Sequence, residues 1–385
     1  MEPPALTVVW DPRFREYDLG PDHPFTERSR ALAAALLETS LAERTGVPVE
    51  WVRSVPPAPR ETLEQFHRPE YLDLVGRAGG YEHPIYLDAG DTPSFPGCFE
   101  EAARIVEGAE RAVAATFDRS RPAFHPSGGL HHARPERASG FCIFNDVAVV
   151  VARAVGRGRR VAYLDIDAHH GDGVMYGFYE SGKVLDIDVH QDGRTLFPGT
   201  GFPSETGRGD GDGLKVNLPL PPLTGDEALV PLFRRVVPPL LREFRPELIV
   251  LQHGVDGHVG DALANLQYTA GAYAEIDRTV LSLARELCEG RLVVTGGGGY
   301  RASAVSRVLA RTGLLLADVA PPADDHPLPE GWRQEFRETF GEAPPATWAE
   351  DERPSGSRWR PELEAKLVAE LEQRLGRKFP RPTAD

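Results

Sequence analysis

The chain has 385 residues, a length that allows one large α/β domain or two smaller ones. Its 58 acidic residues outnumber its 43 lysines and arginines, and the formal net charge of −15 argues against nucleic acid or an anionic membrane as a partner. The three cysteines form no CxxC pair, no leader pattern or membrane-length apolar run is present, and we expect a cytoplasmic protein without disulfides.

Apolar, β-branched segments alternate along the chain with segments of helical periodicity. The predicted strands are LTVVW at 6–10, PAFHPSG at 122–128, VAYLDID at 161–167, KVLDIDVH at 183–190, LIVLQHGVD at 248–256 and RLVVTGGGGY at 291–300. The predicted helices are at residues 30–44, 99–117, 227–244 and 273–288. Strands that are apolar on both faces and alternate with helices predict an α/β fold, in which helices cover a central parallel sheet.

Two long segments without periodicity, at residues 78–97 and 191–215, are interpreted as loops that form a site. Beyond about residue 320, the acidic and Pro-rich stretch APPADDHPLPEG leads to a charged helical segment, PELEAKLVAELEQRLGRKF. We therefore predict a main domain at residues 1–320. A C-terminal Pro-rich and helical extension at residues 321–385 is expected to pack on that domain or to trail from its surface.

The segment LDIDAHHGDG, residues 164–173, follows a predicted buried strand and is dense in side chains that bind metals. Asp165, Asp167 and His169 alternate along an extended segment, so their side chains point to the same side. An Asp-x-His pair offers two ligands of the types that zinc accepts. A solvated acidic turn is the alternative. It is less favoured because carboxylates at the end of a buried strand need a compensating cation or histidine.

A third ligand is expected at the end of another strand, in the segment VLQHGVDGHVGD. Asp256 lies nearest to the end of that strand, and His258 and Asp261 are its competitors. Three protein ligands leave one coordination position open for water or substrate, which is typical of a catalytic zinc site.

Two further motifs supply groups that handle protons and charge. His131 and His132, in SGGLHHARPERASGFC, can act as general base and general acid near neutral pH, and Asp165 and Asp172 are available to orient them. The segment VVTGGGGY lacks the Lys-Ser/Thr of a phosphate loop, and we interpret it as a glycine turn that brings Tyr300 toward an oxyanion. A purely structural role is the alternative for this tyrosine.

Five motifs in a fixed order, GGLHHARPERASGFC, LDIDAHHGDG, TLFPGTG, LQHGVD and TGGGGY, resemble those of the zinc-dependent histone deacetylase family. The resemblance extends from about residue 20 to residue 315, and LPEGWRQEF resembles the bacterial acetoin-utilisation branch of the family. It implies an arginase-like three-layer fold with a central parallel sheet, and a deacetylase catalytic domain at residues 1–320. The implied reaction is hydrolysis of N-acetyl-lysine in proteins, or of an acetylated polyamine, to the free amine and acetate.

The resemblance also implies a role for each matching residue, with Zn²⁺ as the metal and Fe²⁺ or Mn²⁺ as alternatives. The implied metal ligands are Asp167, His169 and Asp256. The implied catalytic residues are His131, His132 and Tyr300, with Asp165 and Asp172 as the carboxylate partners of the histidines. The residues that match the substrate tunnel and its rim are Asp91, Gly140, Phe141, Phe197 and Gly298.

Members of this family also carry a structural potassium ion beside the metal. The matching positions are Asp165, Asp167, His169, Asp188 and Val189. Many relatives have serine where this chain has Asp188, so the extra carboxylate changes the charge of that site. Arg28, after DHPFTE, matches an arginine near the cavity through which acetate is thought to leave, although the second proline of the family's HPxxP motif is missing.

Two other functions fit the sequence less well. A dinuclear manganese hydrolase of the arginase type needs further aspartates two residues beyond the ligands, where Gly171 and His258 stand. A catalytically silent protein that binds acetyl-lysine or an acetylpolyamine would usually have lost a histidine, a ligand or the tyrosine, and all are present. The sequence therefore favours an enzyme, and it leaves the substrate, the native metal and the oligomeric state open.

Overall fold

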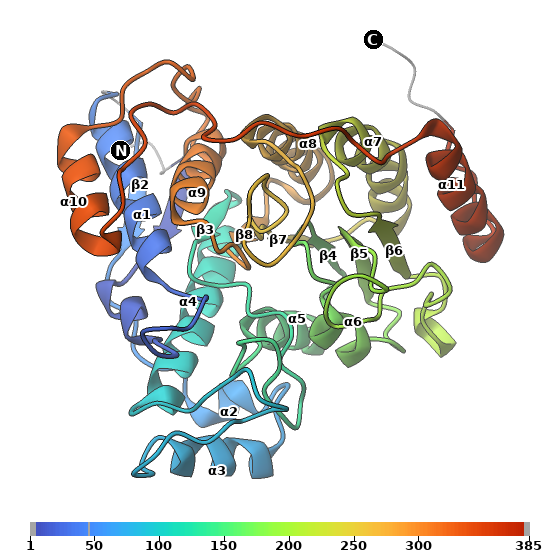
Figure 1. Cartoon of the computed structure of the whole chain (residues 1–385). Coiled ribbons are helices and arrows are strands. Elements are labelled where there is room, and N and C mark those ends of the chain that lie inside the picture. The colour runs from blue at the N-terminus through green and yellow to red at the C-terminus, as the bar shows by residue number, and fades with distance from the viewer. Residues whose placement is uncertain (1–4, 45–46, 381–385) are drawn as a thin grey trace.

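Short apolar segments pair side by side into one parallel sheet. The computed structural model describes residues 5–44 and 47–380, and within them eight strands run in the order β2-β1-β3-β8-β7-β4-β5-β6 (Figure 1). Each neighbouring pair is parallel. The strands are β1 (Leu6–Val9), β2 (Val49–Val52), β3 (Ala123–His125), β4 (Val161–Asp165), β5 (Val184–Gln191), β6 (Lys215–Leu220), β7 (Leu248–Gln252) and β8 (Leu292–Thr295).

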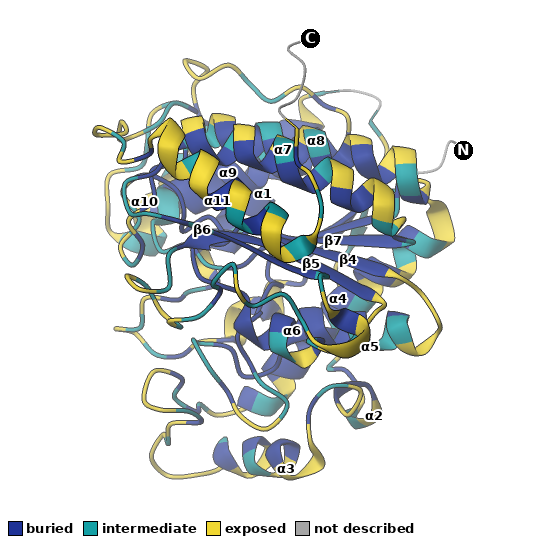
Figure 2. Cartoon of the chain, turned by 90° about the vertical axis from the view of Figure 1, so that its right-hand side faces the viewer, coloured by how far each residue is buried: buried dark blue, intermediate teal, exposed yellow. Residues whose placement is uncertain are grey.

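Helices cover both faces of this sheet, as Figures 1 and 2 show. One face carries α1 (Arg28–Ala42), α7 (Asp226–Phe244), α8 (Ala270–Cys288) and α9 (Ala302–Leu316), and the other carries α4 (Cys98–Arg119), α5 (Asp146–Gly156) and α6 (Asp172–Gly177). The remaining helices are α2 (Arg60–Leu63), α3 (Pro69–Ala78), α10 (Glu330–Phe340), α11 (Pro361–Leu375) and the short 3-10 helices at Pro12–Glu16 and Gly209–Gly211. The predicted three-layer α/β fold with a central parallel sheet is confirmed. Among the described residues, none of the helices combines the length and the apolar character needed to cross a bilayer.

The predicted strands and helices occur with ends that shift by a few residues, but the prediction misses two strands. The edge strand β2 is only half-buried and contains Glu50, so its composition gives a weak strand signal. The other edge strand, β6, begins with Lys215 and contains Pro219. Pairing with β5 buries Lys215, whose Nζ donates to the carbonyl of Val184 at 2.7 Å. The first and last residues of the predicted loop at 191–215 therefore belong to strands: Gln191 ends β5 and Lys215 begins β6.

The C-terminal residues pass across the molecule from one side to the other. In Figure 1 the chain runs from α10, beside α1, over α8 and α7 to α11. Trp332 is buried and its Nε1 donates to the carbonyl of Leu32 at 2.9 Å. Phe336, Trp348 and Trp359 are also buried. Residues 321–380 thus contribute to the packed interior, and the division of the chain at residue 320 stays a prediction.

A glycine sets how closely α4 packs on β3. A β-carbon at Gly108 would lie 2.5 Å from ring atoms of His125, which is fully buried. The two ring nitrogens of His125 lie 3.3 and 3.1 Å from the carbonyls of Val9 and Ile105, so the ring has no room to withdraw. We expect Gly108→Ala to lower the free energy of unfolding by about 1–3 kcal/mol, the usual cost of overpacking.

Urea denaturation measures this free energy. Gly331→Ala in α10 is the matched control, because no other described part of the chain, apart from the neighbouring residues and backbone of α10 itself, comes within 4 Å of the added carbon. The control should leave the stability unchanged or raise it slightly. Equal free energies of unfolding for the two variants would contradict the proposed close packing.

Candidate active site

The site lies where three neighbouring strands end. Asp165, the last residue of β4, is in register with Gln252 of β7 on one side and with Asp188 of β5 on the other. The chain leaving β4 then supplies Asp167 and His169, and the chain leaving β7 supplies Asp256. Because the carboxyl ends of parallel strands share one edge, residues far apart in the sequence meet there.

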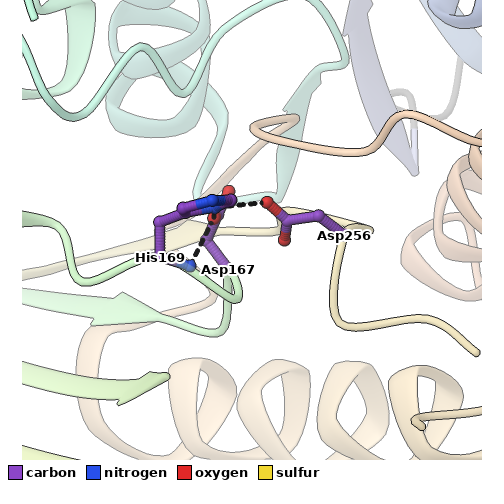
Figure 3. A group of neighbouring side chains, drawn as sticks. All are labelled: Asp167, His169 and Asp256. Carbon is purple, nitrogen blue, oxygen red and sulfur yellow. Dashed lines mark hydrogen bonds and ion pairs between the residues drawn. The ribbon is translucent and has the colours of Figure 1, made fainter. Parts of the chain in front are cut away.

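Asp167, His169 and Asp256 form a compact buried group. One potential ligand atom from each lies within 4.8 Å of the others. His169 Nδ1 is 2.8 Å from Asp256 Oδ2 and 3.2 Å from Asp167 Oδ1 (Figure 3). Burial and the neighbouring Asp167 raise the pKa of Asp256 to about 7. Burial opposes protonation of His169, but Asp256 and Asp167 outweigh it and raise the His169 pKa to about 10.

The chemistry of this group fits a divalent metal. Within the described residues, no lysine or arginine side chain hydrogen-bonds to either carboxylate. Asp167 also accepts from Gln252 Nε2 at 3.0 Å, from the backbone N–H of Gly298 at 2.7 Å and from the backbone N–H of His169 at 2.9 Å. Histidine binds a metal as the neutral imidazole, so once His169 has lost its proton the two carboxylates leave a negative charge that a divalent cation would compensate. Zn²⁺, Fe²⁺ and Mn²⁺ all accept such ligands.

The two competing ligands lie elsewhere in the same loop. His258 Nε2 pairs with Glu350 Oε2 at 2.7 Å, and its Nδ1 lies 2.9 Å from the carbonyl of Val259. Asp261 accepts the backbone N–H of Tyr300 at 2.8 Å. The structure thus brings Asp256 to the candidate metal group and directs both competitors away from it.

The tandem histidines lie beside the candidate metal group, and each bonds to its own carboxylate. His131 Nδ1 is 2.8 Å from Asp165 Oδ2, and His132 Nδ1 is 2.8 Å from Asp172 Oδ1. Their Nε2 atoms are 3.0 Å apart, so one ring donates to the other. Burial disfavours a charge on His131, but Asp165 and Asp167 outweigh it and raise its pKa to about 10. Burial and the charge on His131 lower the pKa of His132 to about 4.

Three supporting residues were not expected from the sequence. Tyr163, inside β4, bonds through its hydroxyl to Asp165, and Arg134 pairs with Asp172 at 2.5 Å. Gln252 ends β7 and contacts Asp167, as described above. Arg134 lies within the quoted motif GGLHHARPERASGFC and Gln252 within LQHGVD, so proximity to the motifs was the available signal. Nothing in the sequence singles out Tyr163 from the other buried strand residues.

Aromatic rings and glycines surround the histidines. The Phe197 ring lies 5.1 Å from the His132 ring, and the Phe141 ring lies 6.0 Å from the Tyr300 ring, between centroids. At Gly140, whose φ is +54°, a β-carbon would lie 2.5 Å from His132 Cδ2. At Gly298 a β-carbon would lie 2.1 Å from Asp256 Oδ2. All four residues expected at the tunnel therefore lie around the site.

Tyr300 is the one residue with a hydroxyl group among those predicted for the site. Its ring lies 6.4 Å from that of His169, between centroids. Burial, followed by the charges of Asp256 and Asp167, raises the pKa of Tyr300 well above its usual value. The phenol therefore stays protonated and can donate a hydrogen bond at neutral pH.

The predicted rim residue Asp91 and Arg28, the arginine predicted near the acetate-exit cavity, are both at the surface. Partial burial of the Asp91 carboxyl, together with its bond to Asp88, raises the pKa of Asp91 to about 6. The Arg28 side chain is 54% exposed and lies 3.9 Å from Asp18, and its place near an acetate exit stays a prediction. The buried arginine is Arg30, which bonds to the carbonyl of Gly297. The residues SR that follow Arg28 offered a second arginine, and only packing distinguishes the two.

Asp188, expected near a potassium ion, is buried in β5. It accepts the backbone N–H of Gly171 at 2.7 Å and lies 2.6 Å from His190 Nδ1. Burial and the neighbouring Asp165 raise the pKa of Asp188 well above its usual value. Val189 follows it in the same buried strand. A monovalent cation beside Asp188 would offset the repulsion between the Asp188 and Asp165 carboxylates.

Comparison with known proteins gives relatives that span most of the chain. A family model described as histone deacetylase domain matches residues 23–314. The acetoin utilization protein AcuC of Bacillus subtilis is 35% identical over 355 residues, covering 89% of this chain and 89% of that protein. AcuC of Staphylococcus xylosus is 33% identical over 351 residues, covering 87% and 88%. A probable deacetylase of Archaeoglobus fulgidus is 35% identical over 344 residues, covering 85% and 91%.

We expect the protein to bind one divalent ion per chain through Asp256 and its two neighbours. Asp256→Asn should weaken Zn²⁺ binding by more than about 100-fold, because it removes a charged ligand from a buried set. His258→Gln is the matched control and should keep the affinity, since the amide that replaces the ring can still donate to Glu350 and so hold the loop. Competition with a chelating indicator measures both. Two ions per chain, or equal losses in the two variants, would count against this ligand set.

Proposed function

Because the chain belongs to the histone deacetylase family, whose members hydrolyse amides, we propose that it is a metal-dependent deacetylase acting on N-acetyl-lysine side chains of proteins. The observation that carries the proposal is the buried group Asp167–His169–Asp256 beside two adjacent histidines, each bonded through Nδ1 to its own carboxylate. We propose Zn²⁺, or Fe²⁺ or Mn²⁺ in its place, as the metal, and a structural K⁺ near Asp188. A cytoplasmic location and a role near acetoin metabolism, as the names of the relatives suggest, complete the proposal.

A divalent ion held by Asp167, His169 and Asp256 would supply Lewis-acid polarisation of the acetyl carbonyl and of a water molecule. The chain's own groups perform the proton transfers. His132 is neutral because of burial and of His131, so its Nε2 can accept a proton from the attacking water. Asp172 holds the proton of the His132 ring at Nδ1, which leaves Nε2 unprotonated. This Nε2 lies 3.0 Å from His131 Nε2 and would exchange that contact for the attacking water.

The later proton transfer uses the other member of the pair. When the C–N bond of the tetrahedral intermediate breaks, the departing nitrogen needs a proton, and His131 is the histidine that carries one. Its bond to Asp165 keeps that charge stable in a buried place. The amide and water thereby give acetic acid and the amine, and the acid's proton passes to the amine as acetate forms. His132 then holds the proton taken from water, and its transfer to His131 across the 3.0 Å contact between their Nε2 atoms restores the pair.

Tyr300 would stabilise the negative charge that develops on the carbonyl oxygen. Its raised pKa keeps the phenol protonated, and a donor aimed at a developing oxyanion typically contributes roughly 100- to 1000-fold in rate. Phe141 and Phe197 supply apolar walls suited to the methylene stem of a lysine. Asp91, at the surface, is placed to accept hydrogen bonds from the backbone of a protein substrate.

Acetate release tests the proposal directly. Metal-stripped protein, with and without added Zn²⁺, is incubated with acetyl-lysine peptides and with acetylated polyamines. We expect release that depends on the metal and is faster with the peptides. Faster release from polyamines would make the chain an acetylpolyamine deacetylase. Tight binding without release under any metal would instead indicate a silent acetyl-lysine-binding protein.

Tyr300→Phe separates the proposed oxyanion donor from a structural tyrosine. We expect kcat to fall roughly 100- to 1000-fold while bound Zn²⁺ stays at the wild-type level, because the phenol is not among the metal ligands. Steady-state kinetics and metal analysis of the same preparation give both values. Tyr268→Phe is the matched control, since Tyr268 is fully buried and its hydroxyl has no hydrogen-bond partner within residues 5–44 and 47–380. Activity near the wild-type value in Tyr300→Phe would show that Tyr300 is not the oxyanion donor.

A further inference from the structure

The C-terminal region reaches back to the loops that carry the candidate active site. Residues 349–352, with the sequence AEDE, lie against the β7–α8 loop and against the start of α9. We call these four residues the acidic strap. The strap is fixed from behind by Trp348, which is buried and whose backbone N–H donates to the carbonyl of His326 at 3.1 Å.

Glu350 closes the loop that begins with Asp256. Its Oε2 lies 2.7 Å from His258 Nε2, and its Oε1 accepts the backbone N–H of Ala270 at 2.7 Å. His258 stands near the start of the loop and Ala270 is the first residue of α8. One carboxylate therefore joins the two ends of the segment that supplies Asp256 and Asp261.

Asp351 and Glu352 hold the other loop. Asp351 accepts from the Ser303 hydroxyl at 2.7 Å and pairs with Arg307 at 2.5 Å, both in α9. Glu352 pairs with Arg301, the residue directly after Tyr300. Consecutive strap residues thus bind both loops at once.

The loop before Tyr300 depends on such external contacts. Residues 296–299 are four glycines, which have no side chains to pack and lose the most conformational entropy on folding. Gly298 donates to Asp167 at 2.7 Å and accepts from Val255 at 2.8 Å, and Tyr300 donates its backbone N–H to Asp261 at 2.8 Å. Beyond Tyr300, the chain is next held by Arg301 and its pair with Glu352.

We propose that the acidic strap is a positioning element, in which Glu350 and Glu352 hold the loops of Asp256 and Tyr300 at the distances that the reaction needs. This inference rests on the proposed role of Tyr300 in deacetylation. Glu350 and Glu352 act on the reaction through His258, Ala270 and Arg301, while Asp351 ties the strap to Ser303 and Arg307 of α9. Loss of a strap contact lowers the fraction of molecules in which Tyr300 is correctly placed. It thereby lowers kcat more than it raises KM.

The pair of Arg301 and Glu352 allows a charge-swap experiment. Arg301→Glu and Glu352→Arg, made singly with Zn²⁺ at saturation, should each lower kcat by about two- to fivefold, as expected for a partly exposed ion pair. The double variant restores opposite charges and should recover most of the loss. A double variant no better than the single ones would overturn the positioning role of this pair.

Glu350 is tested in parallel with two substitutions. Glu350→Ala should lower kcat by roughly tenfold, because His258 and the N–H of Ala270 both lose their acceptor. Glu350→Gln keeps an acceptor oxygen and should lose less. Asp325→Asn is the matched control, as it removes one carboxylate from an exposed position of the same C-terminal region.

Hydrogen exchange gives a second reading that does not require activity. The amides of residues 297–301 should exchange faster in Glu350→Ala and in the single Arg301 and Glu352 variants than in Asp325→Asn. If wild-type protein releases no acetate, the proposed function fails, and exchange alone decides whether the strap holds the loop. If wild-type protein is active but the strap variants match Asp325→Asn in kcat and in exchange, the strap inference is wrong.

Discussion

Negative charge buried at the carboxyl ends of β4, β5 and β7 is the constraint on which the rest of the site depends. Asp165, Asp167, Asp188 and Asp256 are each at most 1% exposed. Unpaired carboxylates in such a place would be strongly disfavoured, so protons, histidines and backbone N–H groups surround them. Burial raises the pKa values of Asp188 and Asp256, which shows how strongly the fold resists further negative charge. A site with so many buried carboxylates is well suited to hold cations. The positions of these carboxylates also determine which of the two neighbouring histidines is charged.

The same demand gives two adjacent histidines different chemistry. His131 lies toward Asp165 and Asp167 and is held as a cation, whereas His132 lies toward Phe197 and stays neutral because a second charge beside the first is disfavoured. Two identical side chains thereby become a donor and an acceptor of protons. Sequence order alone gives no reason for that difference. It arises from which carboxylates each ring faces.

Glycines make the close packing around the carboxylates feasible. A β-carbon at Gly254 would lie 2.0 Å from Asp167 Oδ2, and one at Gly298 would lie 2.1 Å from Asp256 Oδ2. The backbone can therefore donate hydrogen bonds directly to the charged groups. The glycine loop at residues 296–299 consequently has no side chains of its own to anchor it. Contacts from Asp261 to Tyr300 and from the C-terminal region to Arg301 therefore hold the chain that follows it. The acidic strap, which is far from the motifs in sequence, thus contacts the residue next to Tyr300.

The sequence by itself determined the α/β fold class, every described strand except β2 and β6, several helices, and two members of the candidate metal group, Asp167 and His169, because these depend on local periodicity and on ligand types at strand ends. It missed β6, since Lys215 and Pro219 conceal a strand that exists only through pairing with β5. It also gave no sign that packing leaves Arg28 at the surface and buries Arg30. Only the tertiary structure decided between Asp256 and its competitors, separated the two histidines by charge, and brought Glu350 and Glu352 to the active-site loops. These outcomes depend on contacts between residues distant in sequence, on burial and on the summed field of neighbouring charges, none of which a local pattern contains.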